Sequence, residues 1–91
     1  MSNTRVVVTV DGVDHALDIG NLTGRESGVL KRVGKIKGVL EVADALRAGD
    51  MEVVVALAVI AMQRSGINAD PERLLDMPHT MFRITIPENP T

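Results

Sequence analysis

The sequence contains no cysteine, tryptophan or tyrosine, and only one phenylalanine, among its 91 residues. A chain without cysteine has neither disulfides nor thiolate metal ligands, a composition that fits a reducing cytoplasm. Without aromatic side chains it also lacks the stacking platforms on which many proteins bind single-stranded nucleic acids. The core must therefore be built from Val, Leu, Ile, Ala and Met.

A strong charge imbalance and long hydrophobic runs are also missing. The formal net charge of -2 gives no overall field that would attract the protein to nucleic acid or to anionic lipid. The apolar run from Val53 to Met62 is shorter than the roughly 20 residues of a membrane-spanning helix. Residues 1–5 lack the layout of a signal peptide. We expect a single domain over residues 1–91, with loose ends at about 1–4 and 87–91 and with no nucleic-acid or membrane partner.

No grouping of side chains predicts catalysis. His15 and His79 lie far apart in the sequence, and neither has a second ligand nearby at metal-binding spacing. The segment from Gly28 to Lys35 differs from a phosphate-binding loop, because its two glycines enclose five residues instead of four. Lys31, with the basic residues that follow it, is interpreted as part of a solvated face. We expect no catalytic residue, no cofactor and no metal site, so the protein is predicted not to be an enzyme.

Three short strands are predicted at the two ends of the chain. Residues 5–10 and 13–19 flank Asp11-Gly12, a strong hairpin signal because both central residues of that turn need positive φ. The third strand, in which Phe82 and Ile84 alternate with polar residues, ends before Pro87 and is expected to join the hairpin. The hairpin register places six side chains on one face: Val6, Val8, Val10, Val13, His15 and Leu17.

Four helical segments are predicted between the strands. A capping box at Thr23 and Glu26 begins the first, which should end at Gly34. An amphipathic second helix should run from about Lys35 to Ala48, with its apolar side chains at helical spacing. These are Ile36, Val39, Leu40, Ala43 and Leu46.

Gly49 and Asp50 predict the end of the second helix and the start of a third. Glycine adopts the left-handed conformation that ends a helix, and aspartate caps the exposed amides that begin one. The third helix should cover residues 51–65, and Asp70-Pro71 should open a fourth over residues 71–76. The predicted fold class is α+β: an N-terminal β-hairpin and a C-terminal strand in a small antiparallel sheet, packed on three to four short helices.

The predicted third helix is apolar on two opposite sides. Val53, Leu57 and Ile60 fall along one line and form a core face. The opposite side has the spacing of a helix-packing seam, and methionine adapts well to imperfect surfaces. This second face could be covered by the rest of the chain or could bind a partner, and the sequence leaves both open. The candidate partner-binding residues are Met51, Val55, Ala58, Val59 and Met62.

Four short segments of the chain form a recognisable set of motifs. They are Asn21-Leu22-Thr23, the stretch from Ala45 to Asp50, Ala56-Leu57-Ala58, and Arg64-Ser65-Gly66. Together they resemble the small tail assembly chaperones of long-tailed bacteriophages, particularly those that infect actinobacteria, and the similarity covers roughly residues 5–75. The sequence departs from the family pattern at Val59 or Ile60, where a Trp is common, and at Val33-Gly34, where a Thr-Gly turn is common. These differences leave open another small virion component built on a similar domain.

This resemblance implies a function in viral assembly. Such a chaperone binds the helical tape measure protein, keeps it soluble and helps to recruit tail-tube subunits in the host cytoplasm, without joining the finished particle. The alternative is a structural or adaptor subunit that self-associates as a homo-oligomer and remains in the virion. A DNA-binding regulator ranks last, because the second helix carries Glu41 and Asp44 among its basic residues.

Overall fold

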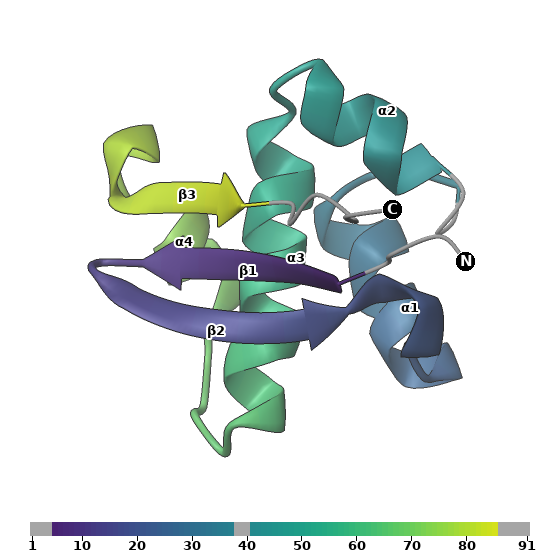
Figure 1. The fold of residues 1–91 in the computed structure, drawn as a ribbon, viewed down its shortest axis with the longest axis horizontal. Coiled ribbons are helices and arrows are strands. Elements are labelled where there is room, and N and C mark those ends of the chain that lie inside the picture. The colour runs from purple at the N-terminus through teal and green to yellow at the C-terminus, as the bar shows by residue number, and fades with distance from the viewer. Residues whose placement is uncertain (1–4, 38–40, 86–91) are drawn as a thin grey trace, which may run out of the picture.

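A three-stranded antiparallel sheet lies against one side of a central helix, α3 (Figure 1). The structure is a computed structural model and describes residues 5–37 and 41–85. Strand β1 (Arg5–Val10) lies between β2 (Val13–Asp18) and β3 (Phe82–Thr85), and α3 (Met51–Arg64) crosses behind all three. The α+β class and the return of the last strand to the hairpin are as predicted. The expected loose ends fall outside the described residues.

The hairpin has the predicted register. Arg5 pairs with Asp18 and Val10 with Val13, and Asp11 and Gly12 have φ of 50° and 81°, as their turn requires. Five of the six inner-face side chains are buried. Val13 is the exception at 55% exposure, because the hairpin turn projects past the edge of α3 (Figure 1).

The second predicted strand ends one residue earlier than expected, at Asp18. Ile19 belongs to a 3₁₀ helix, η1 (Ile19–Asn21), since the Asp18 side chain accepts a hydrogen bond of 3.0 Å from the Gly20 N–H and turns the chain. A second 3₁₀ helix, η3 (His79–Met81), immediately precedes β3. The Asp11 N–H donates to the Met81 carbonyl oxygen at 2.9 Å, which ties this turn to the hairpin.

Helix α1 (Gly24–Val33) begins with the predicted capping box. The Glu26 N–H donates to Thr23 Oγ1 at 3.1 Å, and the Thr23 N–H donates to Glu26 Oε1 at 2.8 Å. The helix ends at Gly34, as expected. A Cβ at Gly34 would lie 2.7 Å from the Leu30 carbonyl oxygen and 3.3 Å from Cγ2 of Val53, so glycine permits the close approach of α1 to α3.

The second helix is shorter than predicted, and the prediction of its start is wrong. Helix α2 covers Val42–Arg47, whereas Lys35 has φ of 57° and is not helical. The Lys37 N–H donates to Glu41 Oε2 at 2.7 Å instead of entering a helix. Parts of the expected apolar face, Val39 and Leu40, lie outside the described residues.

The late start of α2 changes which side chain reaches the core. Val42 is buried at 2% exposure, while Ala43, which was expected on the core face, is exposed. Leu46 remains partly buried against the core, as the pattern predicted. The sequence therefore predicted a helix in this segment correctly, but it assigned the buried position to Ala43 instead of Val42.

The junction between α2 and α3 is as predicted. Gly49 has φ of 75°, and the Asp50 carboxylate accepts from the Glu52 and Val53 N–H groups at 3.0 and 3.4 Å. At the other end of α3, Gly66 has φ of 81° and reverses the chain. Helix α4 (Pro71–Leu75) then begins at an Asp70 cap, one residue shorter than expected.

Helix α3 forms the centre of the core. Its nine consecutive residues from Val53 to Ala61 are all buried, because α3 contacts α1, α2, α4 and all three strands. His15 is enclosed on the inner face of the sheet at 7% exposure. No helix within the described ranges is both long enough and apolar enough to cross a membrane.

Candidate partner-binding site

The structure does not present the five predicted partner-binding residues as one accessible surface. Val55, Ala58 and Val59 are 2%, 0% and 1% exposed, because the other helices and the sheet enclose α3. Met51 and Met62 are half-buried and lie about 16 Å apart at opposite ends of the helix. This burial supports the alternative in which the chain covers both faces of α3 itself.

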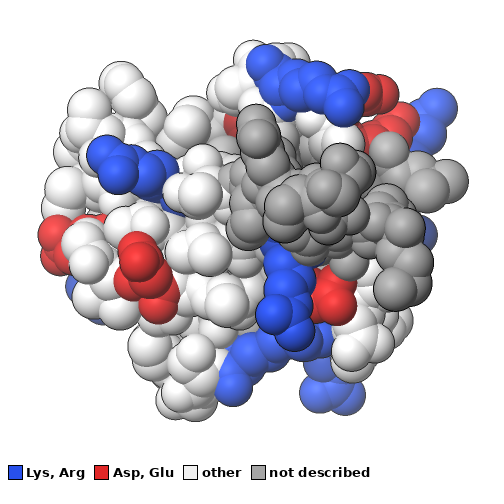
Figure 2. All heavy atoms as spheres, in the orientation of Figure 1, with Lys and Arg blue, Asp and Glu red and all other residues white. Residues whose placement is uncertain are grey.

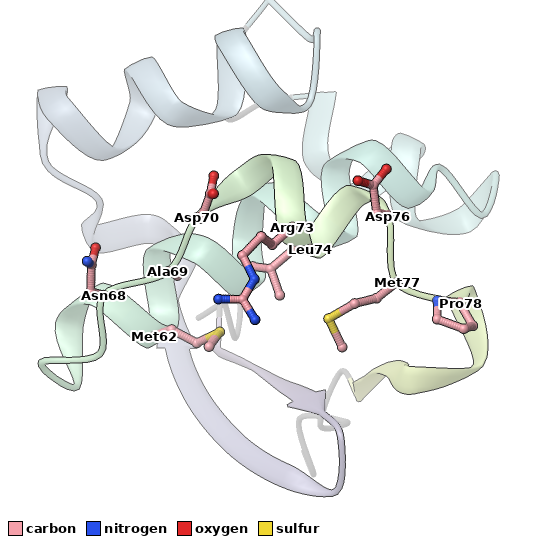
Figure 3. A pocket seen from close by; sticks show the side chains of 9 residues that line it. All are labelled: Met62, Asn68, Ala69, Asp70, Arg73, Leu74, Asp76, Met77 and Pro78. Atoms are coloured by element: carbon pink, nitrogen blue, oxygen red, sulfur yellow. The ribbon is translucent and has the colours of Figure 1, made fainter.

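Met62 nevertheless opens into a surface groove between the end of α3 and α4 (Figure 3). Met62 and Met77 point toward each other from the two sides of the groove, with Leu74 and Arg73 between them. The groove has a volume of about 570 Å³. It is lined by Met62, Asn68, Ala69, Asp70, Arg73, Leu74, Asp76, Met77 and Pro78.

Local turns bring the two methionines together. After α3 ends, the Ile67 N–H donates to the Met62 carbonyl oxygen at 2.9 Å, and the chain turns back beside α3. Asp70 then caps α4 by accepting from the Glu72 N–H at 3.1 Å. At the far end of α4, the Met77 N–H donates to the Leu74 carbonyl oxygen at 3.2 Å. This turn directs Met77 toward the groove (Figure 3).

An ion pair fixes the end of α3 that carries Met62. Arg64 donates from Nε and Nη2 to the two carboxylate oxygens of Glu26 at 2.6 and 2.7 Å, and from Nη2 to the Asn21 carbonyl oxygen at 2.9 Å. The Arg64 hydrogen bonds lower the pKa of Glu26 from 4.5 to about 2, with a further contribution from the Thr23 N–H. The same contact raises the pKa of Arg64. The start of α1 and the end of α3 are thereby held together.

Neither this ion pair nor most of the groove was predicted from the sequence. From the sequence, Glu26 was assigned only to the capping box, and Arg64 was named only in the Arg64-Ser65-Gly66 motif. The two residues are 38 positions apart, so no local spacing connects them. Leu74 and Met77 had no predicted role, although Met77 at the end of the predicted fourth helix is the one signal that could have pointed to a second methionine.

The basic residues near the end of α1 are partly engaged within the chain. Lys35 Nζ lies 3.1 Å from Glu52 Oε2, and Arg32 Nε donates to the Gly28 carbonyl oxygen at 3.4 Å. On the face shown in Figure 2, basic and acidic side chains are interspersed among uncharged ones. Among residues 5–37 and 41–85, no group of three His, Cys, Asp or Glu side chains could hold a metal ion.

The groove combines an apolar floor with a polar rim. The floor includes two flexible thioethers, a kind of group that packs against varied side chains. No family model, curated protein or solved structure matches this chain. The chemistry of the groove is therefore the basis for the functional proposal.

Proposed function

We propose that this protein is a tail assembly chaperone of a long-tailed bacteriophage, and that it binds a helical segment of the tape measure protein in the groove between α3 and α4. The observation that carries the proposal is the apolar floor of this groove, formed by Met62, Leu74 and Met77 at the surface of a small domain. The motifs shared with tail assembly chaperones supply the identity of the partner.

The size of the groove suits a transient complex. A volume of about 570 Å³ holds a few apolar side chains, such as those along one stripe of an amphipathic helix. A helix that inserts only a few side chains buries a small interface, and small interfaces are typical of weak and reversible complexes. A chaperone that must release the tape measure protein before the tail is complete needs such reversibility.

The binding mode explains how solubility would be maintained. A long polypeptide with exposed apolar stripes is prone to aggregate until its final partners cover those stripes. A small protein that occupies them in the host cytoplasm lowers the concentration of free apolar surface. Recruitment of tail-tube subunits would require a second surface, away from the groove.

Co-expression tests this function. The protein is produced together with a candidate tape measure protein, and the soluble yield and co-purification of the two are measured. Met77→Asp places a charge in the groove, whereas Leu75→Asp places the same charge on the other side of α4, where Leu75 is 38% exposed and lines a different cleft. Circular dichroism verifies that both variants fold.

The wild type and Leu75→Asp are expected to raise the soluble yield and to co-purify with the tape measure protein, in a complex that survives a chelator. Met77→Asp should do neither. Equal behaviour of the two variants would exclude the groove as the binding site. A stable position in purified virions, without any effect on tape measure solubility, would contradict the chaperone function.

The alternative function, a self-associating structural or adaptor subunit, is favoured by one observation. Within residues 5–37 and 41–85, strands β2 and β3 are the two edges of the sheet, and the exposed Val13 lies on β2. Free strand edges can pair with a second copy of the chain. Light scattering across a concentration series would then show a dimer that Val13→Asp weakens, whereas the chaperone proposal expects no such effect.

A further inference from the structure

We infer that Arg73 binds a glutamate side chain of the partner helix, set at the centre of that helix's apolar stripe. The inference deepens the proposed function and rests on it. Of the three charged side chains that line the groove in the described part of the chain, only that of Arg73 is directed toward the apolar floor (Figure 3).

The helical period of α4 places Arg73 on the groove side. Arg73 and Leu74 both line the groove, and Met77 joins them about one turn later. Glu72 and Leu75 instead line a different cleft, on the other side of α4. The stem of Arg73 therefore runs beside apolar side chains and carries its guanidinium into the groove (Figure 3).

The two carboxylates of the groove do not pair with this guanidinium. Asp70 and Asp76 are the caps of α4, and their carboxylates point away from the side on which Arg73 lies (Figure 3). Asp70 Oδ1 instead accepts from the Glu72 N–H at 3.1 Å. None of the ion pairs found within residues 5–37 and 41–85 includes Arg73. The guanidinium is therefore available to a partner.

A guanidinium beside apolar groups favours one kind of partner group. A helix that closes the groove removes water from Arg73, and a charge that loses water needs hydrogen bonds to a group of opposite charge. A carboxylate accepts two parallel N–H bonds from the planar guanidinium. Among the acidic residues, glutamate has the higher helix propensity, so it suits a partner that binds as a helix.

The two methionines indicate where this glutamate lies in the partner. Met62 and Met77 point toward each other from the two sides of the groove, with Arg73 between them (Figure 3). On a helix, the side chains three or four residues before and after a given position share its face. The partner is therefore expected to carry apolar residues at these flanking positions, one for each methionine, and glutamate between them.

Two labelled helical peptides of identical composition test the inference. Both have the same stripe of Leu and Met. One has Glu at the centre of the stripe and Gln on the opposite face, and the other has these two residues exchanged, so their net charges are equal. Circular dichroism verifies that both peptides are helical. Their Kd values are measured by fluorescence anisotropy for the full-length wild type, Arg73→Gln, Arg83→Gln and Met77→Asp.

The peptide with the central Glu is expected to bind the wild type about fivefold more tightly, because a partly exposed ion pair contributes modestly. Arg73→Gln should remove most of this preference. Arg83→Gln removes the same charge from an exposed position on β3 that lines a different hollow, and it should leave the preference unchanged. Added salt should reduce the preference of the wild type, because it screens the ion pair.

The outcomes separate this inference from the proposed function. If both peptides bind the wild type equally well and Met77→Asp abolishes both, the groove binds helices but Arg73 does not select glutamate. If Arg83→Gln lowers the preference as much as Arg73→Gln does, net charge explains the preference and the inference is wrong. If neither peptide binds, the helix-binding groove and the inference both fail.

Discussion

Replacing Glu26 by Gln would remove the charge from the carboxylate that links the start of α1 to the end of α3. Both carboxylate oxygens accept from Arg64, at 2.6 and 2.7 Å, and the Glu26 side chain is 15% exposed. Glutamine at this position can still accept from the Thr23 N–H and so preserves the capping box. The substitution therefore tests the ion pair itself.

The magnitude follows from the pKa of the carboxyl group. A fall in the pKa of Glu26 from 4.5 to about 2 on folding corresponds to about 3 kcal/mol of stability in full. Because the Arg64 side chain is 35% exposed, solvent screening reduces the expected loss in Glu26→Gln to about 2 kcal/mol. The lowered pKa means that this stability is present above about pH 4.5 and is lost as the pH falls toward 2.

Urea unfolding of the wild type and Glu26→Gln from pH 7 to pH 2 would measure this contribution. The difference in the free energy of unfolding should be largest at neutral pH and should shrink steadily below about pH 4.5. Asp44→Asn is the matched control, because it breaks an ion pair whose two side chains are 78% and 83% exposed. Its effect should stay within about 0.5 kcal/mol. If the stability difference between the wild type and Glu26→Gln is absent at pH 7, or constant down to pH 2, the charge of Glu26 does not stabilise the fold in this way.

Three further predictions concern the fold, and thermal or urea unfolding tests each. Gly34→Ala should destabilise the protein by about 1–3 kcal/mol, because the added methyl meets a backbone carbonyl oxygen, whereas Gly28→Ala, where the space is open, should stabilise α1 by about 1 kcal/mol; the opposite order would contradict the packing of α1 on α3. Gly49→Val should cost more than the roughly 1 kcal/mol expected for loss of the cap in Asp50→Ala, since φ at Gly49 is 75°; equal and negligible effects would mean that one helix continues through this point. Val55→Asp should prevent folding, because its side chain is 2% exposed; a folded variant would place this side of α3 at the surface.

The elements that sequence reasoning predicted correctly are those whose signals lie within a few residues. Asp11-Gly12 specified the hairpin register, the Thr23 capping box specified the start of α1, and Gly49-Asp50 separated α2 from α3. In each case the backbone conformation and the hydrogen-bonding side chains belong to the same short segment. Local chemistry was therefore sufficient to predict these elements.

The errors arise where distant segments meet. Lys35 adopts positive φ although it is not glycine, and it pairs with Glu52 on another helix. No spacing near Lys35 indicates such a contact. The helical pattern that begins there was therefore extended too far toward the N-terminus, and α2 was predicted to begin about seven residues before Val42.

The candidate site could be predicted only in part. The apolar character of α3 indicated a surplus of buried surface, and Met62 was among the predicted residues. How much of that surplus the chain covers by itself depends on the packing of α1, α4 and the sheet, which is a tertiary property. The groove exists because the chain reverses at Gly66 and brings Leu74 and Met77 beside Met62.

Methyl NMR of the five methionines can test directly whether a partner helix binds between Met62 and Met77. The protein carries carbon-13 methyl labels, each signal is assigned by a single Met→Leu substitution, and a helical fragment of the tape measure protein is added in steps. The Met62 and Met77 signals should shift together and saturate, while the Met51 signal at the other end of α3 stays in place. A complex that forms without moving Met62 and Met77, or that moves Met51 alone, would contradict this binding mode.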